Sequence, residues 1–436
     1  MSSQVDDRPN VLLMHSHDLG RHLGCYGRGV ETPAIDSITR DGVQFDEYYC
    51  TAPQCGPSRS SIMTGRHPHD NGLMGHHWLG WGLHDDVETM PGLLREAGYT
   101  TAVYGVQHVG PDPDEIGYDT SDTGNVSADE LATRVVSYLE EDRDSPFFAS
   151  VGFFEPHRLG PDHRRGFHAP EYDASDPDEI TVPEYLPDID VVRDEIAGFQ
   201  GMIRAVDEAV GEILASLEGE GLADETLIIF TTDHGIAMPR AKGMCYDPGI
   251  ETTLVARYPG LFEGGTRYDS LLSNVDLMPT ILDVAGVDGA GDVAGRSFLP
   301  LVRGDEYDER ERIFVEMTFH DKYNPVRGVR TDRYKYLRSF DDQPEVYLPQ
   351  DILFGPSGLE FHYEYYSESR PEEELYDLKA DPLERENLVD DPDYETAADE
   401  LRQAVDNWME DTDDPLLDGD VHVPKEHVEM LKTSPW

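Results

Sequence analysis

The chain has 436 residues, of which 38% are hydrophobic, so it can bury a large core and is expected to form one large domain with a smaller one attached. Its 89 acidic residues outnumber 34 basic ones and give a formal net charge of −55. This excess is spread along the whole chain. It argues against binding to nucleic acid or to an anionic membrane surface, and it is typical of the solvated acidic surface of halophilic proteins.

The lack of a recognisable targeting signal and the small number of cysteines predict a protein of the cytoplasm. The segment 1–9 has no basic region followed by an apolar run, so we do not expect it to be a secretory signal. No stretch approaches the roughly 18 apolar residues of a membrane helix. Four cysteines in this length do not make a disulfide framework, and Cys25, Cys50 and Cys245 are expected to be core residues.

The first predicted strand is the apolar run 9–16, which lacks polar alternation and so fits a strand covered on both faces of a parallel sheet. His17 and Asp18 follow it, at the carboxyl end where open α/β sheets bind ligands. A short helix is predicted over 33–40.

The stretch 51–66 places Cys55 just ahead of a predicted helix, with Pro57 at the first helical position and Gly65 after the last turn. A helix start favours an anion, which here would be a thiolate or a bound sulfate or phosphate. Arg59 adds a fork of hydrogen-bond donors one turn away. The alternative is a buried structural cysteine, the commoner fate of a free thiol.

Strands and helices then alternate. The expected strands cover 99–105, 146–154 and 227–232, and the expected helices cover 90–97, 199–217 and 276–286. The segment 159–190 is rich in Pro, Asp and Gly and is expected to be a long loop or lid. This alternation predicts an α/β fold with a mixed, largely parallel, doubly wound sheet and helices on both faces, over residues 1–305.

After residue 305 the pattern changes. Short stretches with period-2 alternation lie at 313–317, 326–331 and 334–338, and a closing helix is expected over 394–409. Residues 306–436 are therefore predicted to form a smaller subdomain, an antiparallel sheet packed with one helix.

Polar side chains follow several predicted strands. Asp18 follows the first, His108 lies past a second, His157 follows a third, and Asp233 with His234 follows a fourth. Any one alone is more often structural, but all are expected at one sheet edge near Cys55. Carboxylates and imidazoles can hold a divalent cation, which would polarise an oxyanion ester.

The run Cys55–Arg59 (CGPSR), followed by Thr64–Arg66 (TGR), resembles the signature of the type I sulfatases, the formylglycine-dependent family of the alkaline phosphatase superfamily. The resemblance covers essentially the whole chain, because further family-like stretches lie at 9–13, 230–235, 276–283, 329–336 and 374–382. The stretch 153–158, Lys242 ahead of 246–249, and Trp408 look closest to the heparan N-sulfatase branch.

This resemblance implies a role for each matching residue. Cys55 would be converted by a maturation enzyme to formylglycine, whose hydrated aldehyde is the nucleophile. The metal would be bound by the set Asp18, Asp233, His234 and the modified Cys55, with His17 close to it. Arg59 would hold the oxygen of the nucleophile, and His108 would be the base that expels sulfate. His157 and Lys242 would contact the sulfate and its leaving atom.

Two positions depart from the family pattern. His17 stands where the family usually has Asp, so calcium is the first expectation but manganese or zinc becomes plausible. Val106 stands where the family usually has a sulfate-binding Lys. The missing charge must then come from Arg158 or Lys242, or the substrate is unusual.

The predicted function is a sulfatase that hydrolyses a sulfate ester or sulfamate, expected on a sugar. One alternative is a phosphodiester or phosphonate monoester hydrolase of the same superfamily. Another is a non-catalytic sulfatase-like binding protein, which the intact run Cys55–Arg59 disfavours, since a binding protein needs no oxidisable cysteine there.

Overall fold

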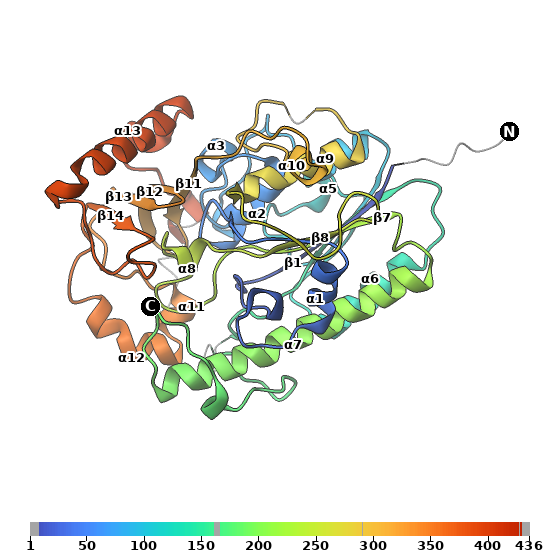
Figure 1. The fold of residues 1–436 in the computed structure, drawn as a ribbon, viewed down its shortest axis with the longest axis horizontal. Helices are drawn as coiled ribbons and strands as arrows, with labels where there is room; N and C mark the ends of the chain where they lie inside the picture. The colour runs from blue at the N-terminus through green and yellow to red at the C-terminus, as the bar shows by residue number, and fades with distance from the viewer. Residues whose placement is uncertain (1–7, 161–165, 290, 427, 430–436) are drawn as a thin grey trace.

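The computed structural model describes residues 8–160, 166–289, 291–426 and 428–429. They form a large eight-stranded sheet and a smaller four-stranded sheet, with helices around both (Figure 1). The segment 1–7, on which the expectation about a secretory signal depends, lies outside the described part. Within that part, no helix combines the length and hydrophobicity that spanning a bilayer requires.

The large sheet has the strand order β5-β4-β6-β1-β7-β8-β2-β9. Neighbours from β5 to β7 are parallel, whereas β8 runs antiparallel to both β7 and β2, so the predicted mixed, largely parallel sheet is confirmed. The strands are β1 (Asn10–Ser16), β2 (Val43–Phe45), β4 (Thr100–Gly105), β5 (Thr120–Thr123), β6 (Phe147–Gly152), β7 (Thr226–Thr232), β8 (Leu254–Arg257) and β9 (Thr266–Tyr268). A separate short pair joins β3 (Tyr48–Tyr49) to β10 (Leu272–Ser273).

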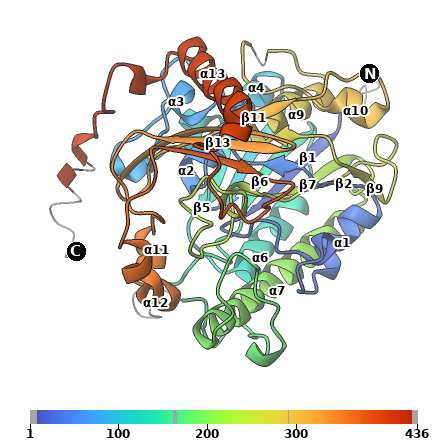
Figure 2. The same ribbon diagram turned by 60° about the vertical axis from the view of Figure 1, so that its left-hand side comes forward.

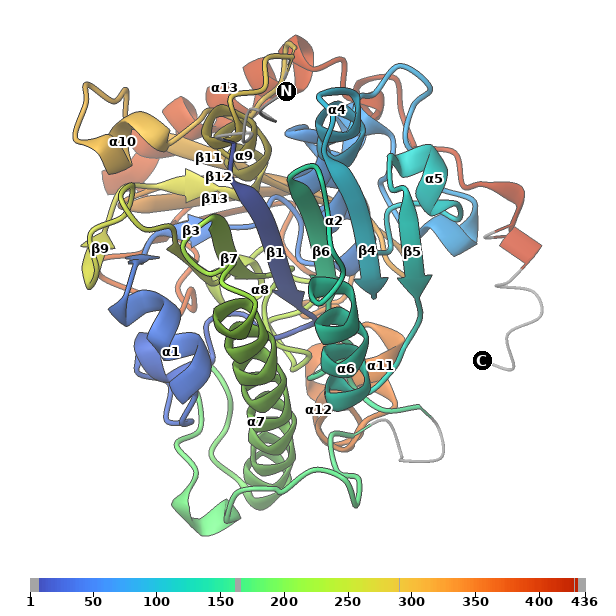
Figure 3. The same cartoon turned by 90° about the vertical axis from the view of Figure 1, so that its right-hand side faces the viewer.

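Strand β1 is buried on both faces, which explains its unbroken apolar sequence. Leu12 and Met14 belong to the core packed under α1 (Pro33–Arg40), α6 (Ala128–Leu139) and α7 (Asp190–Gly219). Val11 and Leu13 point to the opposite core, under α2 (Cys55–Thr64), α4 (Met90–Glu96) and α9 (Leu277–Ala285). Figure 3 shows α6 and α7 in front of the strands and α2 behind them. Helices on both faces are therefore confirmed.

The smaller sheet is antiparallel, in the order β11-β12-β13-β14, as predicted for this part of the chain. Its strands are β11 (Arg312–Phe319), β12 (Tyr323–Thr331), β13 (Tyr334–Ser339) and β14 (Glu373–Asp377). Helix α13 (Glu395–Asp411) buries Val405 and Trp408 in the core that it shares with this sheet (Figure 2). The domain boundary at 305/306 stays a prediction.

Shorter helices complete the connections. The α-helices are α3 (Pro68–Asn71), α5 (Pro113–Ile116), α8 (Asp247–Ile250), α10 (Leu299–Arg303), α11 (Gln350–Leu353) and α12 (Pro356–Tyr365). Single 3-10 turns lie at Gly24–Tyr26, His77–Leu79, Pro177–Glu179, Asn274–Asp276, Pro392–Tyr394 and Pro415–Leu417.

Two predicted helix starts were wrong. Helix α7 begins at Asp190 rather than Phe199, because Val192 and Ile196 extend its buried face by more than two turns. Helix α2 begins at Cys55, two residues before Pro57. A proline is tolerated there because the N–H groups of a first helical turn have no partner within the helix. The expected loop 159–190 holds the turn Pro177–Glu179, and its residues 161–165 lie outside the described part.

A buried contact joins strand β11 of the smaller sheet to helix α3. Glu316 on β11 accepts a hydrogen bond from the backbone N–H of His69 on α3 at 2.9 Å and also contacts the His69 ring. Burial alone would raise the pKa of the Glu316 carboxyl, but the charges of His69 and Arg327 lower it to about 2. The ionised carboxylate is thus the form that stabilises this contact.

We expect Glu316→Gln to lower the stability of the protein by on the order of 3 kcal/mol at neutral pH. The sign follows from the lowered pKa. The contribution is fully present above the unfolded pKa, near 4.5, and is lost as the pH falls towards 2. Thermal unfolding of wild type and variant at pH 7 and pH 3 checks this, because the gap between them should narrow at pH 3. A gap of equal size at both values would contradict the assignment.

Candidate active site

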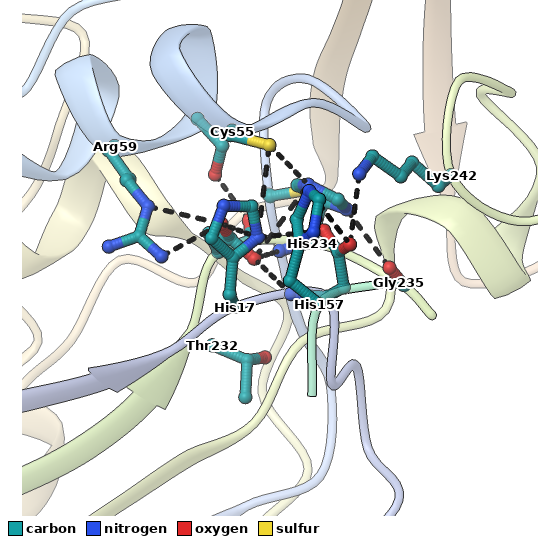
Figure 4. Close-up of polar contacts among 12 residues, drawn as sticks. His17, Cys55, Arg59, His157, Thr232, His234, Gly235 and Lys242 are labelled. Carbon is teal, nitrogen blue, oxygen red and sulfur yellow. Dashed lines mark hydrogen bonds and ion pairs between the residues drawn. The ribbon is translucent and has the colours of Figure 1, made fainter. Parts of the chain in front are cut away.

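The candidate site lies where four adjacent strands of the large sheet end. Strands β4, β6, β1 and β7 are neighbours in the sheet order, and their carboxyl ends lead to His108, His157, Asp18 and Asp233 respectively. Helix α2 places Cys55 over the same edge (Figure 4). The sheet topology therefore brings together the side chains that the sequence predicted to converge.

Five of these residues form a compact cluster. One possible ligand atom from each of His17, Asp18, Cys55, Asp233 and His234 lies within 4.8 Å of all the others, and all five residues are buried. The Nε2 atom of His234 lies 3.1 Å from Oδ1 of Asp18 and 3.4 Å from Sγ of Cys55. His17 takes part directly, with Nδ1 2.9 Å from Oδ1 of Asp18 and 3.8 Å from Sγ of Cys55.

Backbone contacts hold this cluster in place. Oδ1 of Asp233 accepts hydrogen bonds from the backbone N–H groups of Asp18 and His234, both at 2.9 Å. The ring of His234 donates from Nδ1 to the Gly235 carbonyl at 2.9 Å, which leaves Nε2 as its acceptor atom. Asp18 itself adopts a left-handed backbone conformation, with φ at 51°, which directs the chain away from β1.

The two carboxylates of the cluster are ionised. Burial alone would raise the pKa of Asp18, but Lys242, His157 and His234 lower it below the usual range. Burial would likewise raise the pKa of Asp233, which His234 and Arg59 lower. Two buried carboxylates beside two imidazoles form a donor set that fits a divalent cation.

Cys55 is the first residue of α2, and its side chain is 2% exposed. Burial raises the pKa of its thiol well above the usual value, and the nearby Lys242 only partly opposes this shift. The expectation that the helix start would stabilise a thiolate is therefore wrong for the unmodified residue. Burial and the neighbouring Asp18 and Asp233 carboxylates outweigh the helix dipole.

Arg59 and Lys242 are bound to carboxylates. Arg59 donates from Nε to Oδ2 of Asp233 at 3.1 Å, and its Nη2 lies 3.0 Å from the same oxygen. Lys242 donates from Nζ to Asp18 at 2.9 Å and to Asp351 at 2.8 Å. Burial would lower the pKa of Lys242, but Asp18 and Asp351 raise it well above the usual value, so it carries a charge.

The two remaining predicted histidines flank His17. The ring of His157 lies 4.5 Å from it and the ring of His108 lies 5.2 Å from it, as distances between centroids. His157 donates from Nδ1 to the Arg158 carbonyl at 2.7 Å, while its Nε2 lies 3.9 Å from Oδ2 of Asp18. Within the described part of the chain, Nδ1 of His108 is buried and has no hydrogen-bond partner.

Arg158 does not supply the charge missing at Val106. Its side chain is buried, forms an ion pair with Glu195 of α7, and donates from Nε to the Ala237 carbonyl at 2.7 Å. The sequence suggestion was wrong because the partner carboxylate comes from a helix 37 residues further along the chain.

Residues that the sequence reasoning missed complete the site. Asp351 of α11 offers a carboxylate oxygen within 4.8 Å of atoms from both Asp18 and His157. His76 and His320 each place a ring nitrogen within 4.8 Å of Sγ of Cys55. The pairs His76-His77 and His320-Asp321 were the only local signals, and nothing in the sequence links them to Cys55.

A cluster that could hold a metal ion at the ends of parallel strands, with an oxidisable side chain at a helix start, is compatible with a hydrolase of oxyanion esters. A comparison with protein families identifies the class of hydrolase. Residues 9–287 match the model described as Sulfatase, and residues 239–364 match the model described as N-sulphoglucosamine sulphohydrolase, C-terminal. The chain belongs to the sulfatase family, and the predicted resemblance is confirmed.

Known proteins agree with this assignment. The chain is 28% identical to an ulvan-active sulfatase of Formosa agariphila, over 93% of this chain and 75% of that protein. It is also 28% identical to human N-sulphoglucosamine sulphohydrolase, over 94% and 91%. A structure solved in complex with its substrate D-glucosamine-2-N,6-O-disulfate superposes with a TM-score of 0.74 at 22% identity, over 95% of this chain and 100% of that one. The enzyme is a sulfatase, and this reading is supported over the superfamily alternatives.

Proposed function

We propose that this sulfatase removes a sulfate group from a sugar, as an O-sulfate ester or an N-sulfamate. The observation that carries the proposal is the cluster of His17, Asp18, Asp233 and His234 around Cys55, at the ends of β1 and β7. The sugar part rests on the relatives, because the named proteins act on ulvan or bear the name N-sulphoglucosamine sulphohydrolase.

The side chains around this cluster would have separate roles. Arg59 and the backbone N–H groups of Asp18 and His234 fix Asp233, so that its carboxylate faces the cluster. Lys242 neutralises Asp18 and Asp351 beside the space that a sulfate would fill. A divalent cation, when bound, would supply positive charge for an oxyanion and for the oxygen of the nucleophile. Because the fold holds these charges in place before the substrate binds, they need no reorganisation during the reaction.

A substrate panel tests the proposal. Matured protein should hydrolyse 4-nitrophenyl sulfate and at least one of glucosamine N-sulfate and a sugar O-sulfate, and should prefer them to an aryl phosphonate. Faster turnover of the phosphonate would favour the phosphonate monoester hydrolase instead. Tight binding of a sugar sulfate with no turnover of any substrate would favour the non-catalytic reading.

His157→Ala should distinguish the release of the leaving group from the binding of sulfate. His157 donates from Nδ1 to the Arg158 carbonyl, so a cationic His157 would carry a second proton on Nε2, which it could pass to the departing oxygen or nitrogen. We expect a loss of about 10²–10⁴-fold in kcat with a sugar sulfate, and a much smaller loss with 4-nitrophenyl sulfate, whose leaving group needs little protonation. Equal losses on both substrates would show that His157 only binds sulfate or shapes the pocket.

We also propose the partners that this chemistry requires. The protein would depend on a formylglycine-generating enzyme acting on Cys55, and on a divalent cation. The sequence favours calcium for that cation, whereas the imidazoles of His17 and His234 favour manganese or zinc. Metal analysis of protein from its native host decides between them. Four free cysteines support a reducing compartment, and cell fractionation would test the cytoplasmic location.

A further inference from the structure

A second group of side chains shares Cys55 with the metal-supporting cluster. One ring nitrogen of His76, one of His320 and Sγ of Cys55 all lie within 4.8 Å of one another. His76 is 5% exposed and His320 is 8% exposed. Their rings meet edge to face, with centroids 4.7 Å apart. These two imidazoles therefore border the same space as the nucleophile without belonging to the cluster of five.

Each ring keeps one nitrogen unused. Among the described residues, Nδ1 of His76 and Nε2 of His320 are buried and make no hydrogen bond. A buried polar atom without a partner costs about 1–3 kcal/mol, so a ligand that bonded to both nitrogens would remove this cost. For His76, Nδ1 faces the start of α2, because a Cβ built on Gly56 would lie 3.6 Å from it.

His320 is held by a carboxylate. It follows the last residue of β11, and its Nδ1 lies 3.1 Å from Oδ1 of Asp321. Asp321 in turn accepts hydrogen bonds from the buried hydroxyl of Tyr347 and, at 3.1 Å, from the backbone N–H of Gln350. This contact fixes the ring, so that its Nε2 points away from the Asp321 carboxylate.

His76 is fixed from its other side. Its ring stacks on Trp78, with centroids 4.1 Å apart and planes 11° apart, and Trp78 also meets the edge of His108 at 4.9 Å. Burial lowers the pKa of His76 well below its usual value, and His320 lowers it further. His76 is therefore a neutral ring that can donate one hydrogen bond, and it lies beside His320.

The other cations around the site are each paired with carboxylates. Arg59 is bound to Asp233, and Lys242 is shared between Asp18 and Asp351. Arg158 is bound to Glu195, and position 106 is valine. A sulfuryl group presents several anionic oxygens at once, and hydrogen bonds to such oxygens from charged or aligned donors are the strong ones.

We propose that His320 and His76 bind the sulfate oxygens of the substrate, with Asp321 as the residue that positions His320. This inference rests on the proposed function, because it assigns the oxygen-binding residues of the same reaction. His320 and His76, which lie in other parts of the chain, would bind the sulfate oxygens in place of a cationic side chain at position 106. It also gives the C-terminal sheet a direct part in catalysis, since His320 lies at the end of its first strand.

Inorganic sulfate is the probe for the test. Its dissociation constant is measured by calorimetry on matured, metal-loaded protein, and KM and kcat for 4-nitrophenyl sulfate are measured on the same protein. His320→Ala should weaken sulfate binding about 10- to 100-fold, with a matching rise in KM. His76→Ala should weaken it about tenfold or less, and Asp321→Asn about threefold to tenfold. His320→Gln, which keeps a side-chain N–H, should recover part of the loss.

The controls separate sulfate binding from other effects. His362 of α12 carries an imidazole whose Nδ1 lies 3.0 Å from the Leu359 carbonyl, so His362→Ala should bind sulfate like the wild type. Circular dichroism and thermal unfolding identify variants that fail to fold, and in that event His320→Gln and Asp321→Asn carry the test.

Each outcome has one meaning. Weaker sulfate binding with unchanged metal content supports the inference. Unchanged sulfate binding in His320→Ala, in an enzyme that still cleaves 4-nitrophenyl sulfate, overturns it and leaves the proposed function standing. Loss of metal from His320→Ala also overturns it, because His320 would then support the metal cluster. A wild-type protein that neither binds nor cleaves sulfates removes the proposed function together with the inference.

Discussion

Replacing Cys55 by alanine is expected to abolish sulfate ester hydrolysis, with a loss of at least about a thousandfold in kcat. The residue is the first of α2 and belongs to the cluster of five, with Sγ 3.4 Å from Nε2 of His234. Its thiol has a pKa raised by burial, so the unmodified side chain is a poor nucleophile at neutral pH. We therefore expect activity to depend on the conversion of Cys55 to the hydrated aldehyde that the family resemblance implies.

Mass spectrometry checks the modification directly. Trypsin should release the peptide 41–59, in which conversion of Cys55 replaces the thiol sulfur by an aldehyde oxygen and lowers the mass. Cys25→Ala is the matched control. Cys25 is partly buried near the start of α1 and outside the cluster of five, so its loss should leave activity intact. Fully active protein carrying an unmodified Cys55 thiol would refute the assignment.

Asp233→Ala is expected to remove the metal, abolish activity and lower the stability by about 3–5 kcal/mol. The carboxylate is fully buried, belongs to the cluster of five and is the partner of Arg59. Without it, the guanidinium of Arg59 is left buried and unpaired. Asp233→Asn keeps the shape and an acceptor for the N–H groups of Asp18 and His234, but loses the charge. It should therefore lose metal and activity with a smaller loss of stability.

Metal analysis and thermal unfolding of both variants give the measurement. The matched control is Asp276→Asn, because Asp276 is equally buried and paired, accepting a hydrogen bond from Nε of Arg310 at 2.9 Å, but lies outside the cluster of five. This control should be destabilised while keeping its metal content. Full metal occupancy in Asp233→Ala would show that the cation is held elsewhere.

The cluster of five is also expected to lose stability in acid. The pKa values of Asp18 and Asp233 are both lowered in the folded protein, so their ion pairs stabilise the fold above the pKa values of the unfolded chain. Their contribution disappears as the pH falls below that range. Glu316, in its separate network, adds to the same acid sensitivity.

Much of the fold could be predicted from local sequence patterns. The run 9–16 is apolar without interruption because β1 is covered on both faces, and such a run can be recognised without a structure. Polar residues also follow each long strand of the parallel core within a few positions, which predicted the edge where Asp18, His157 and Asp233 meet. Parallel strands end at one edge of a sheet, so order along the chain was sufficient for this part of the site.

Local patterns were insufficient where elements are short or where packing decides. Strands β8 and β9 have four and three residues, too few for a period to show. The beginning of α7 at Asp190 depends on Val192 and Ile196 meeting the core, in a stretch whose composition otherwise resembles a loop. The raised pKa of the Cys55 thiol, which opposes the expected thiolate, likewise depends on burial. Burial cannot be predicted from the sequence of α2 alone.

By itself, the sequence determined the sulfatase signature at Cys55, the parallel core and the residues at its strand ends, because each depends on neighbours in the chain. Only the tertiary structure decided which carboxylate each buried cation meets. It pairs Arg158 with Glu195 and Lys242 with Asp351, and it also brings His320 close to Cys55. Lys242 and Asp351 are separated by 109 positions, and no local pattern records such a contact. Buried charges must find partners wherever the fold places them, and that placement is a property of the packed sheets rather than of any one segment.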